Sequence, residues 1–270
     1  MPPLLVRSWN VFHGNASPPE RQAYLEPAVR LASADAPDVL LLQELPVWAL
    51  ERLEHWSGMR AFGEVAAPPR LGPLPSTPSI GRALTSIHPG ALRSAFTGQA
   101  NAILLSPGLL PLRRDVIVLN TRRFRRSQAR RLELGLVARL AWAKERRVCH
   151  AVRAAVPDGR TLLVAGLHAT SYPADGRLAD AEVLRAGVFA DALAEPGDVC
   201  ILGGDFNVEP GRSRSFAELE SWGFSAPGTR IDHIFVRNGR VGPLEAWPVE
   251  RRCVDGHRLS DHPPVEVRIE

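Results

Sequence analysis

Apolar runs that end in polar side chains recur along this chain. The run at 39–42 is apolar at every position, which is typical of a strand buried on both faces, and Gln43 and Glu44 follow it. The run at 199–202 ends in two glycines and then in Asp205 and Asn207. Side chains alternate along a strand, so continued strand geometry would put Asp205 and Asn207 on one face. Burying them without partners is costly, and we therefore expect them to face a polar cleft.

Both stretches also fit a plainer interpretation. Glycine, aspartate and asparagine all favour turns, so the run at 199–202 would simply end in one. An acid that follows a strand often opens a helix, where the helix dipole stabilises its charge. Neither stretch decides between these interpretations alone, and the remaining acidic and histidine motifs must do so.

Further periodic segments predict additional strands. These lie at 4–11, 98–106, 147–156, 161–167, 231–236 and 265–269. Asp158-Gly159 between two apolar runs is the strongest short-range hairpin signal and predicts that 147–156 pairs with 161–167. We also expect 115–119 to pair with the strand at 98–106.

Helical patterns separate these strands. Ser17-Pro18-Pro19-Glu20 is a capping-box pattern with proline at the first helical position, and it predicts a helix that Pro27 shortens or kinks. The predicted buried face of this helix contains Leu25, Ala28, Val29 and Ala32. The buried face predicted for the helix that leads into 199–202 contains Ala181, Leu184, Val188 and Ala192.

Three other segments are less regular. The stretch 127–144 fits both a strand and a helix, and its length and its Ala, Arg and Leu content favour a helix. A short helix is predicted at 216–222. The segment 66–90 is rich in proline and glycine and predicts a long irregular loop. Strand patterns resume on both sides of that loop, so we interpret it as a loop within one domain that spans 1–270.

Composition indicates an ordinary globular protein. The chain has 270 residues, of which 45% are hydrophobic and 23% charged. No apolar run approaches the roughly 18 residues of a membrane span, and the N-terminus shows no signal peptide. The three cysteines are scattered without metal-type spacing, which argues against a disulfide framework. We therefore expect a cytoplasmic protein, and we expect a monomer.

Arginine dominates the positive charge. The net charge is +4, and Lys144 is the only lysine. The segment Arg113–Arg131 holds eight arginines and one acid, Asp115. Such a run could bind the phosphate backbone of nucleic acid. The general preference for arginine in this sequence slightly favours the other interpretation, a solvated face.

Polar residues with catalytic potential gather at the predicted strand ends. They are Asn10, Glu44, His168, Asp205, Asn207, Asp232, Asp261 and His262. Carboxylates and amides with few nitrogen ligands suit a hard cation such as Mg²⁺ or Mn²⁺, whereas no pattern of cysteines or paired histidines indicates zinc. No nucleophile elbow, phosphate loop or dinucleotide fingerprint occurs, which argues against a covalent triad and against those nucleotide sites.

Six motifs in order resemble the endonuclease/exonuclease/phosphatase superfamily, whose fold is DNase-I-like. They are Trp9-Asn10, Gln43-Glu44, Leu167-His168, Gly204-Asp205-Phe206-Asn207, Arg230-Ile231-Asp232-His233-Ile234 and Ser260-Asp261-His262. Gln-Glu alone is a weak signal, but Gly-Asp-Phe-Asn combined with a C-terminal Ser-Asp-His is highly specific. The motifs extend over nearly the whole chain.

The resemblance implies a fold and a chemistry. The fold is a four-layer α/β/β/α sandwich of two mainly antiparallel sheets with outer helices. The chemistry is hydrolysis of phosphodiesters or phosphomonoesters with Mg²⁺. An anionic phosphoester repels hydroxide, so the site must first neutralise charge, and a bound cation does this.

The resemblance also implies a role for each matching residue. Glu44 is the principal metal ligand, with Asn10 and Asp261 near the same metal. His262 resembles the catalytic histidine and Asp232 the carboxylate that orients it and favours its protonated form. Asp205 and Asn207 resemble the pair that positions the attacking water and the phosphate, and Asp205 can accept the water's proton. His168 resembles a phosphate contact.

Two departures from the family pattern bear on the site. Pro107 stands after Ser106 where many relatives have arginine, so Asn101 or a nearby arginine would have to replace that phosphate contact. His233 stands where many relatives have an aromatic residue, a change that we interpret as tolerated.

Three functions remain open from the sequence. The first is a phosphodiesterase or nuclease that cleaves by in-line attack of water without a covalent intermediate. The second is a phosphatase or lipid-type phosphodiesterase that acts on a small phosphorylated head group. The third is a catalytically silent binding module, against which the complete set of acids and histidines argues.

Overall fold

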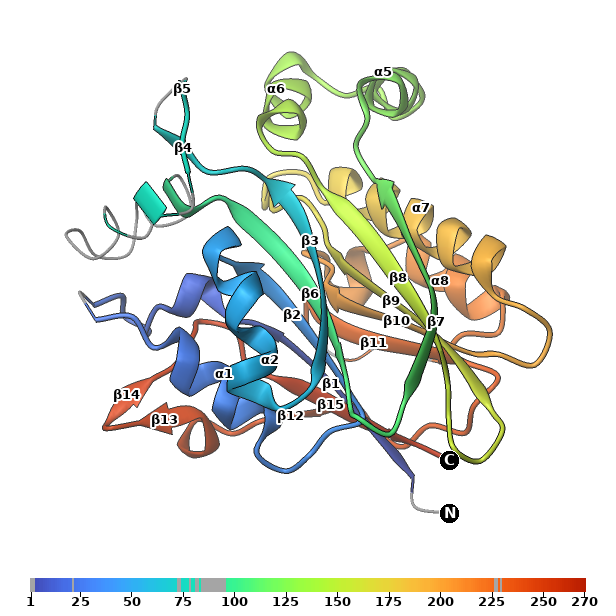
Figure 1. The fold of residues 1–270 in the computed structure, drawn as a ribbon. Coiled ribbons are helices and arrows are strands. Elements are labelled where there is room, and N and C mark those ends of the chain that lie inside the picture. The colour runs from blue at the N-terminus through green and yellow to red at the C-terminus, as the bar shows by residue number, and fades with distance from the viewer. Residues whose placement is uncertain are drawn as a thin grey trace. The chain divides into compact units, whose positions relative to one another are not determined.

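Two large β-sheets organise the chain, one in each of two compact units. The computed structural model describes residues 3–270 except 21, 72–73, 78, 81–82, 84–95, 226–227 and 229. The first unit comprises Met1–Leu109 with Gly242–Glu270, and the second comprises Leu110–Val241. The colours of Figure 1 follow the chain through both units. The expectation that 1–270 is a single domain stays a prediction.

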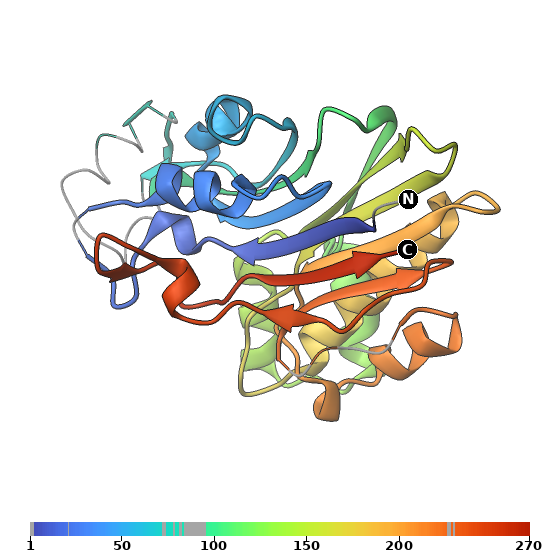
Figure 2. The ribbon, with the colours of Figure 1, turned by 90° about the horizontal axis from the view of Figure 1, so that it is seen from below.

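The sheet of the first unit has six strands. They are β1 (Leu4–Asn10), β2 (Val39–Leu45), β3 (Arg60–Ala67), β6 (Gln99–Leu105), β12 (Glu245–Ala246) and β15 (Val265–Ile269). Their order is β12-β15-β1-β2-β6-β3, and only β1 and β2 run parallel. The last strand pairs with the first from Leu4 opposite Ile269, so the two ends of the chain lie at one end of this sheet (Figure 2).

Two helices cover one face of this sheet. They are α1 (Leu25–Ser33) and α2 (Leu53–Ser57), and Trp9, Leu40 and Leu104 pack beneath them. The predicted buried face of α1 is confirmed, because Leu25, Ala28, Val29 and Ala32 are all buried. Residues of the opposite sheet face, such as Leu41 and Ile103, are buried as well. The strand at 39–42 is therefore covered on both faces, as its continuous apolar run predicts.

The start of α1 was predicted wrongly. The helix begins at Leu25 and not after Ser17, whose backbone N–H instead bonds Arg258 O at 2.8 Å. The short helix Phe12–Gly14 precedes Ser17, and Gly14 accepts a hydrogen bond from Tyr24 N, the residue before α1. Pro27 falls in the first turn of α1, where its missing N–H has no helical partner to lose, so it neither ends nor shortens the helix.

An ion-pair network ties β1, β15 and the end of α1 together. Arg7 is completely buried, and its guanidinium bonds Asp35 at 2.6 and 2.7 Å and Glu266 at 2.8 Å. Arg251 bonds the same two carboxylates, each at 2.9 Å. The two guanidinium groups lie 4.4 and 3.8 Å from the ring centre of Trp247. The buried positive charge of Arg7 is thus paired with two carboxylates, as burial of a charge requires.

Shorter elements complete the first unit. They are the helical segment Val47–Arg52, β4 (Arg70–Leu71), β5 (Leu74–Pro75), the turn Glu250–Arg252, β13 (Cys253–Val254) and β14 (His257–Arg258). The pairs β4–β5 and β13–β14 form two-stranded ribbons. The irregular loop predicted at 66–90 begins with the end of β3 and the β4–β5 ribbon, and much of its remainder lies outside the described residues.

The sheet of the second unit has five strands in the order β11-β10-β9-β8-β7. They are β7 (Leu110–Val118), β8 (Val148–Ala155), β9 (Thr161–His168), β10 (Val199–Asp205) and β11 (Asp232–Arg237). The predicted hairpin of β8 and β9 is confirmed. Gly159 in its turn has φ +90°, a conformation that glycine adopts without strain. Only β9 and β10 run parallel, so both sheets are mainly antiparallel.

The predicted partner of 115–119 was wrong. That segment belongs to β7, which pairs with β8. The strand at 98–106 is β6, and its two edges are occupied by β2 and β3. A strand has only two hydrogen-bonding edges, so β6 has no place for a third partner.

Helices α7 (Arg177–Leu193) and α8 (Ser215–Ser221) pack in the second unit, and a short turn lies at Pro210–Arg212. The buried face predicted for α7 was wrong, because Val188 is 53% exposed. The buried face consists of smaller residues, among them Ala179, Val183, Ala186 and Ala190. A Cβ at Gly187 would lie 2.5 Å from Leu219 of α8. Close approach to α8 therefore selects the small-residue face over the bulkier one.

The segment predicted as one helix at 127–144 forms two helices that lie side by side in Figure 1. They are α5 (Arg122–Arg131) and α6 (Leu136–Lys144), and Gly135 precedes the second. Thr121 caps α5 through a hydrogen bond from Phe124 N to its hydroxyl. None of the helices among the described residues has the combined length and hydrophobicity of a membrane span.

Candidate active site

The end of β2 places Glu44 outside the regular alternation of the strand. The register of β2 against β6 shifts between Leu42 and Leu45, and Glu44 has φ +54°. Its carboxylate accepts a hydrogen bond from Asn10 Nδ2 at 3.2 Å and lies 3.4 Å from His13 Nε2. The Glu44 side chain stays 20% exposed. This bulge thus joins a solvent-accessible carboxylate to the end of β1.

Ser260 connects the C-terminal motif to the same strand end. Its hydroxyl donates to Asn10 O at 2.7 Å and accepts from His262 N at 3.1 Å, and it lies 3.4 Å from Asp261 Oδ1. The carbonyl of His262 accepts from Trp9 Nε1 at 2.9 Å. Four of the predicted residues are therefore held together within the first unit: Asn10, Glu44, Asp261 and His262.

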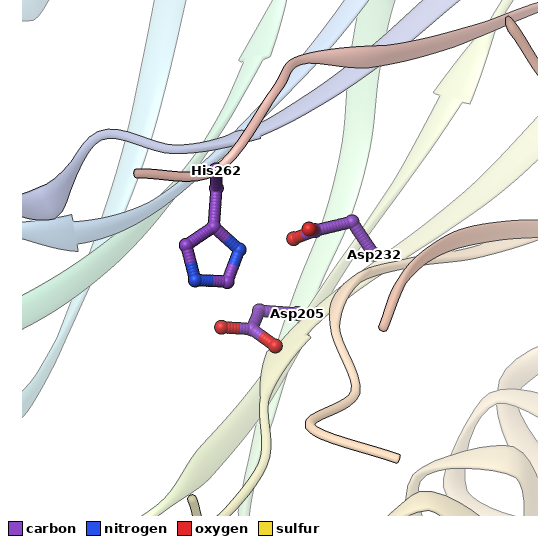
Figure 3. A group of neighbouring side chains, drawn as sticks. All are labelled: Asp205, Asp232 and His262. Atoms are coloured by element: carbon purple, nitrogen blue, oxygen red, sulfur yellow. The ribbon is translucent and has the colours of Figure 1, made fainter. Parts of the chain in front are cut away.

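The second unit holds another set at one edge of its sheet. Asp205 on β10 pairs in register with His168 on β9 and with Asp232 on β11. Strands β9 and β10 are parallel and end at this edge, and the antiparallel β11 begins there. All three side chains are buried. Figure 3 shows Asp205 and Asp232 on the ends of their strands.

Asn207 lies beside Asp205 because the chain turns after β10, not because side chains alternate along the strand. Strand β10 ends at Asp205, and Asn207 has φ +51°. Its backbone N–H donates to Asp205 Oδ1 at 3.0 Å, and its side-chain amide donates to Ala169 O at 3.1 Å. Of the two alternatives that the sequence left open, the strand therefore ends in a turn, and Asp205 and Asn207 are still neighbours.

Gly204 makes the pairing of β9 and β10 possible at this edge. Its φ is +141°, and a Cβ there would lie 2.0 Å from Leu167 O. No other residue fits this space without moving the backbone. The glycine before Asp205 therefore serves the close approach of the strand that carries His168.

Arg147 is a candidate residue that the sequence analysis did not identify. It is buried, its Nη1 lies 3.1 Å from His168 Nδ1, and its Nη2 donates to Glu145 Oε2 at 2.6 Å. A guanidinium only donates, so His168 Nδ1 is the acceptor. The ring hydrogen then sits on His168 Nε2, which lies 3.5 Å from Asp205 Oδ2. The abundance of arginine in the sequence concealed this residue.

Asn101 is a second residue that the sequence underrated. It lies on β6 between Ala100 and Ala102, whose partners Leu45 and Leu42 flank the bulge at Glu44. It is buried, and neither atom of its amide has a hydrogen-bond partner among the residues that the structure describes. Such orphaned groups are rare in folded proteins and call for an explanation. A ligand that accepts and donates hydrogen bonds supplies one.

His233 has a packing role beside Asp232. Its ring lies 4.8 to 5.7 Å from the rings of Phe206, Phe216 and Phe235. Burial lowers the pKa of His233 to about 4, so the ring is neutral at pH 7. Its Nδ1 accepts a hydrogen bond from Gly228 N at 3.2 Å. The imidazole therefore packs among three aromatic rings, and the tolerance of this change stays a prediction.

The donor atoms suit a hard divalent cation. In the first unit Glu44 and Asp261 offer carboxylate oxygens, and Asn10 offers an amide oxygen. Asp205, Asp232 and His262, drawn in Figure 3, also carry potential ligand atoms. Oxygen-rich sets with little nitrogen and no sulfur fit Mg²⁺ or Mn²⁺ better than zinc. The chemistry of these donors thus fits the cation that the sequence motifs imply.

Comparisons with known proteins agree with this geometry. The family model described as "Endonuclease/Exonuclease/phosphatase family" matches residues 8–262. No curated protein matches the sequence.

Solved structures match almost the whole chain. A conserved protein of unknown function from Enterococcus faecalis is 13% identical, with a TM-score of 0.67 over 99% of each chain. An endonuclease/exonuclease/phosphatase from Beutenbergia cavernae is 18% identical, with a TM-score of 0.65 over 100% of this chain and 72% of that one. The human Nocturnin catalytic domain with bound sulfate is 16% identical, with a TM-score of 0.66 over 100% and 93%. The predicted DNase-I-like fold is confirmed, and the chain belongs to the endonuclease/exonuclease/phosphatase family.

Proposed function

We propose that this protein is a phosphoester hydrolase that depends on a divalent cation. Family membership supports phosphoester hydrolysis in general. The observation that carries the proposal is the arrangement of the motif residues. They stand at strand ends or in the loops beside them, in two sets. Hydrogen bonds join the first set, and strand register joins the second. A binding module would not need this combination of carboxylates and imidazoles.

The set in the first unit is the proposed cation site. Glu44, Asp261 and Asn10 would hold Mg²⁺ or Mn²⁺, and the remaining exposure of Glu44 leaves room for water ligands. When bound, the cation neutralises phosphate charge and stabilises the leaving oxygen. Ser260 positions this set, because its hydroxyl joins Asn10 O to the backbone of His262.

The set in the second unit is the proposed hydrolytic centre. Asp205 accepts the proton of the attacking water, and the backbone N–H of Asn207 holds this carboxylate in place. His168 contacts the phosphate, and Arg147 fixes the tautomer and direction of its ring. In the first unit, His262 is proposed to donate hydrogen bonds to the substrate phosphate, the role that its motif implies.

Water, and not a side chain, is the proposed nucleophile. Cys149 and Cys200 are buried, and burial raises the pKa of both thiols, that of Cys200 to about 12. Neither thiol supplies a thiolate at neutral pH. All three cysteines are free, which agrees with the reducing cytoplasm that we propose as the compartment. Attack by water is in line with the leaving oxygen, without a covalent intermediate.

Two substrate classes are candidates. The first is the phosphodiester of a nucleic acid, which the arginines of 113–131 favour. Six of these lie on α5, whereas Arg113 pairs with Asp115 at 2.7 Å. The second is a phosphorylated lipid head group, which is favoured by the exposed apolar residues of α6 next to those arginines.

The decisive experiment measures hydrolysis of several phosphoesters. Plasmid nicking and hydrolysis of bis(p-nitrophenyl) phosphate and p-nitrophenyl phosphate are assayed with Mg²⁺, with Mn²⁺ and with EDTA. We expect metal-dependent turnover of a diester that Glu44→Gln and Asp205→Asn both lower strongly. Glu218→Gln removes an exposed acid of α8 and serves as the control that keeps activity. Full activity of either site variant would contradict the assignment, and a phosphorylated protein after acid quenching would contradict the mechanism.

A further inference from the structure

Helix α5 presents a concentrated basic face. Six of its ten residues are arginine, and none is acidic. Arg122, Arg126 and Arg130 follow one another at helical spacing and, with Arg123, line a hollow of about 580 Å³. A second hollow of about 590 Å³ lies between these arginines and Arg139, Trp142 and Ala143 of α6. The basic surface therefore extends from α5 onto α6, two helices that lie next to each other in Figure 1.

Helix α6 presents an apolar face that no described residue covers. Leu136, Val137 and Leu140 are 72%, 70% and 62% exposed. Their spacing of one and four residues puts them on one side of the helix. Ala138 and Trp142 are buried on the other side. Arg139 lies between Val137 and Leu140 in sequence and lines the arginine hollow, so the apolar and basic surfaces adjoin.

The two helices form a fixed structure. Phe124 and Trp142 pack edge to face with ring centres 6.0 Å apart, and Arg125 Nη1 donates to Trp142 O at 3.1 Å. Asn120 closes the base of the hairpin by donating to Glu145 O at 2.7 Å. Arg177 of α7 holds the connection by donating to Leu132 O at 2.7 Å. The exposure of the leucines thus belongs to a preformed surface.

The combination of both faces points to one occupant. We propose that α5 and α6 bind the surface of a bilayer that contains anionic lipids. The arginines would contact lipid phosphates, and Leu136, Val137 and Leu140 would enter the boundary between head groups and acyl chains. A nucleic acid backbone would use the arginines but leave the leucines in water. A second copy of this chain would bring its own six arginines against these. Only the anionic bilayer satisfies both surfaces, and the proposal does not depend on the catalytic assignment.

Vesicle binding tests this inference without substrate turnover. The full chain is sedimented with 100 nm vesicles of phosphatidylcholine alone and of phosphatidylcholine with about 30% phosphatidylserine. We expect binding to the anionic vesicles that weakens as salt rises. Arg122→Gln/Arg126→Gln/Arg130→Gln should lower the affinity roughly 100-fold, since each cationic side chain near an anionic surface contributes about fivefold. Leu136→Gln/Leu140→Gln should lower it at least about tenfold.

Matched controls separate this surface from general effects of charge and hydrophobicity. Arg268→Gln removes an exposed arginine of β15, and Val188→Gln removes an exposed apolar residue of α7. Both should bind as the parent chain does, and circular dichroism should show that every variant is folded. Equal binding to both vesicles, or no binding, would overturn the proposal. Tight binding of a 20-base-pair DNA duplex with no vesicle binding would identify a nucleic-acid surface instead. A dimer that Leu136→Gln/Leu140→Gln dissociates would identify a contact between copies.

Discussion

The two units hold their functional side chains in different ways. In the second unit, His168, Asp205 and Asp232 occupy paired positions on three adjacent strands, and all are buried. In the first unit, Glu44 lies at the bulge of β2, and Asp261 lies in the loop before β15. Glu44 and Ser260 have φ values of +54° and +57°, and Asp261 is exposed. One set is fixed by sheet register, and the other is held by a bulge and a serine hydroxyl.

This difference matches the two tasks that we propose for the sets. A carboxylate that activates water must keep a fixed orientation, and pairing of β10 with the strands on both sides holds Asp205 in place. A hydrated cation exchanges water and accepts several geometries, so its carboxylates need access to solvent. Non-glycine residues at positive φ are uncommon, and the surrounding structure must stabilise them. In the first unit that support comes from the Ser260 hydroxyl, which donates to Asn10 O. It also comes from Arg7 of β1, which bonds Asp35 and Glu266.

The largest predicted effect is on catalysis, and variants of the two sets should differ in how their activity depends on metal concentration. We expect Asp205→Asn to lower kcat by about 10⁴-fold, because the general base is lost, while the metal concentration for half-maximal activity stays unchanged. Glu44→Gln should instead raise that metal concentration. Metal titrations of steady-state rates provide the measurement, and Glu218→Gln is the control. The division of labour would fail if Asp205→Asn shifted the metal midpoint and Glu44→Gln did not.

The next prediction concerns the ion pairs of Arg7 in the first unit. Arg7→Met should lower the free energy of unfolding by about 3 kcal/mol, because the largely buried Glu266 loses its buried partner and keeps only Arg251 and Trp247. Burial favours the neutral carboxyl of Glu266, but hydrogen bonds from Trp247, Arg7 and Arg251 outweigh it and lower the pKa of Glu266.

Arg251 supplies a matched control for Arg7. It bonds the same Asp35 and Glu266, yet its side chain is 38% exposed where that of Arg7 is fully buried. Arg251→Met should therefore cost about 1 kcal/mol or less. Urea unfolding of both variants gives the comparison. Equal losses would show that burial of Arg7 is not what stabilises this side of the sheet.

Periodicity located most elements of both units, but not their partners. Buried runs such as 39–42 and 199–202 identified β2 and β10 because both faces of these strands are covered. The partner of β7 was wrong because apolar pattern carries no information on which edge of a strand is occupied. The buried face of α7 was wrong because close packing at Gly187 selects small residues. The first turn of α1 was misplaced because Ser17 bonds Arg258, a contact far away in sequence.

The candidate site was predictable where a motif marks it. Glu44, Asp205 and Ser260-Asp261-His262 stand in short patterns that recur in the family. Arg147 has no such pattern and is one arginine among many. His13 follows β1 in a short helix at φ +53°, and its proximity to Glu44 depends on that irregular backbone. Side chains that act through tertiary contacts leave little trace in a single sequence.

The free energy of unfolding should depend on pH through His233 of the second unit. Burial lowers the pKa of His233 to about 4, whereas an unfolded histidine titrates near about 6.5. Between these values the unfolded chain binds a proton that the folded chain does not. Stability should therefore fall as the pH drops from about 6.5 to about 4, by about 3 kcal/mol from this residue.

Comparison of two variants isolates this contribution. His233→Phe keeps an aromatic ring among Phe206, Phe216 and Phe235, and it should flatten the loss of stability in this pH range. His55→Gln alters an exposed histidine of α2 and should follow the parent chain. The measurement is urea unfolding at intervals between pH 4 and pH 7. Parallel curves for His233→Phe and the parent chain would rule out a buried neutral imidazole.

The smallest predicted effect concerns two buried asparagines, one in each unit. Asn120 of the second unit donates to Glu145 O at 2.7 Å and accepts from Arg147 N at 2.9 Å. Asn101 of the first unit has no such partners among the described residues. Replacing a satisfied buried amide by leucine costs stability, whereas replacing an orphaned one is neutral or favourable. Asn101→Leu should thus raise the free energy of unfolding by about 1 kcal/mol, while Asn120→Leu lowers it.

Activity completes the argument about Asn101. A polar group that is buried without a partner is retained at a cost to stability, and contact with a ligand explains why it persists. Asn101→Leu should then raise thermal stability and lower hydrolysis about tenfold, the opposite signs that mark a residue kept for function. A variant that lost stability and kept full activity would show that Asn101 is structural. In that case the contrast between the two units would rest on Glu44 and Asp261 alone.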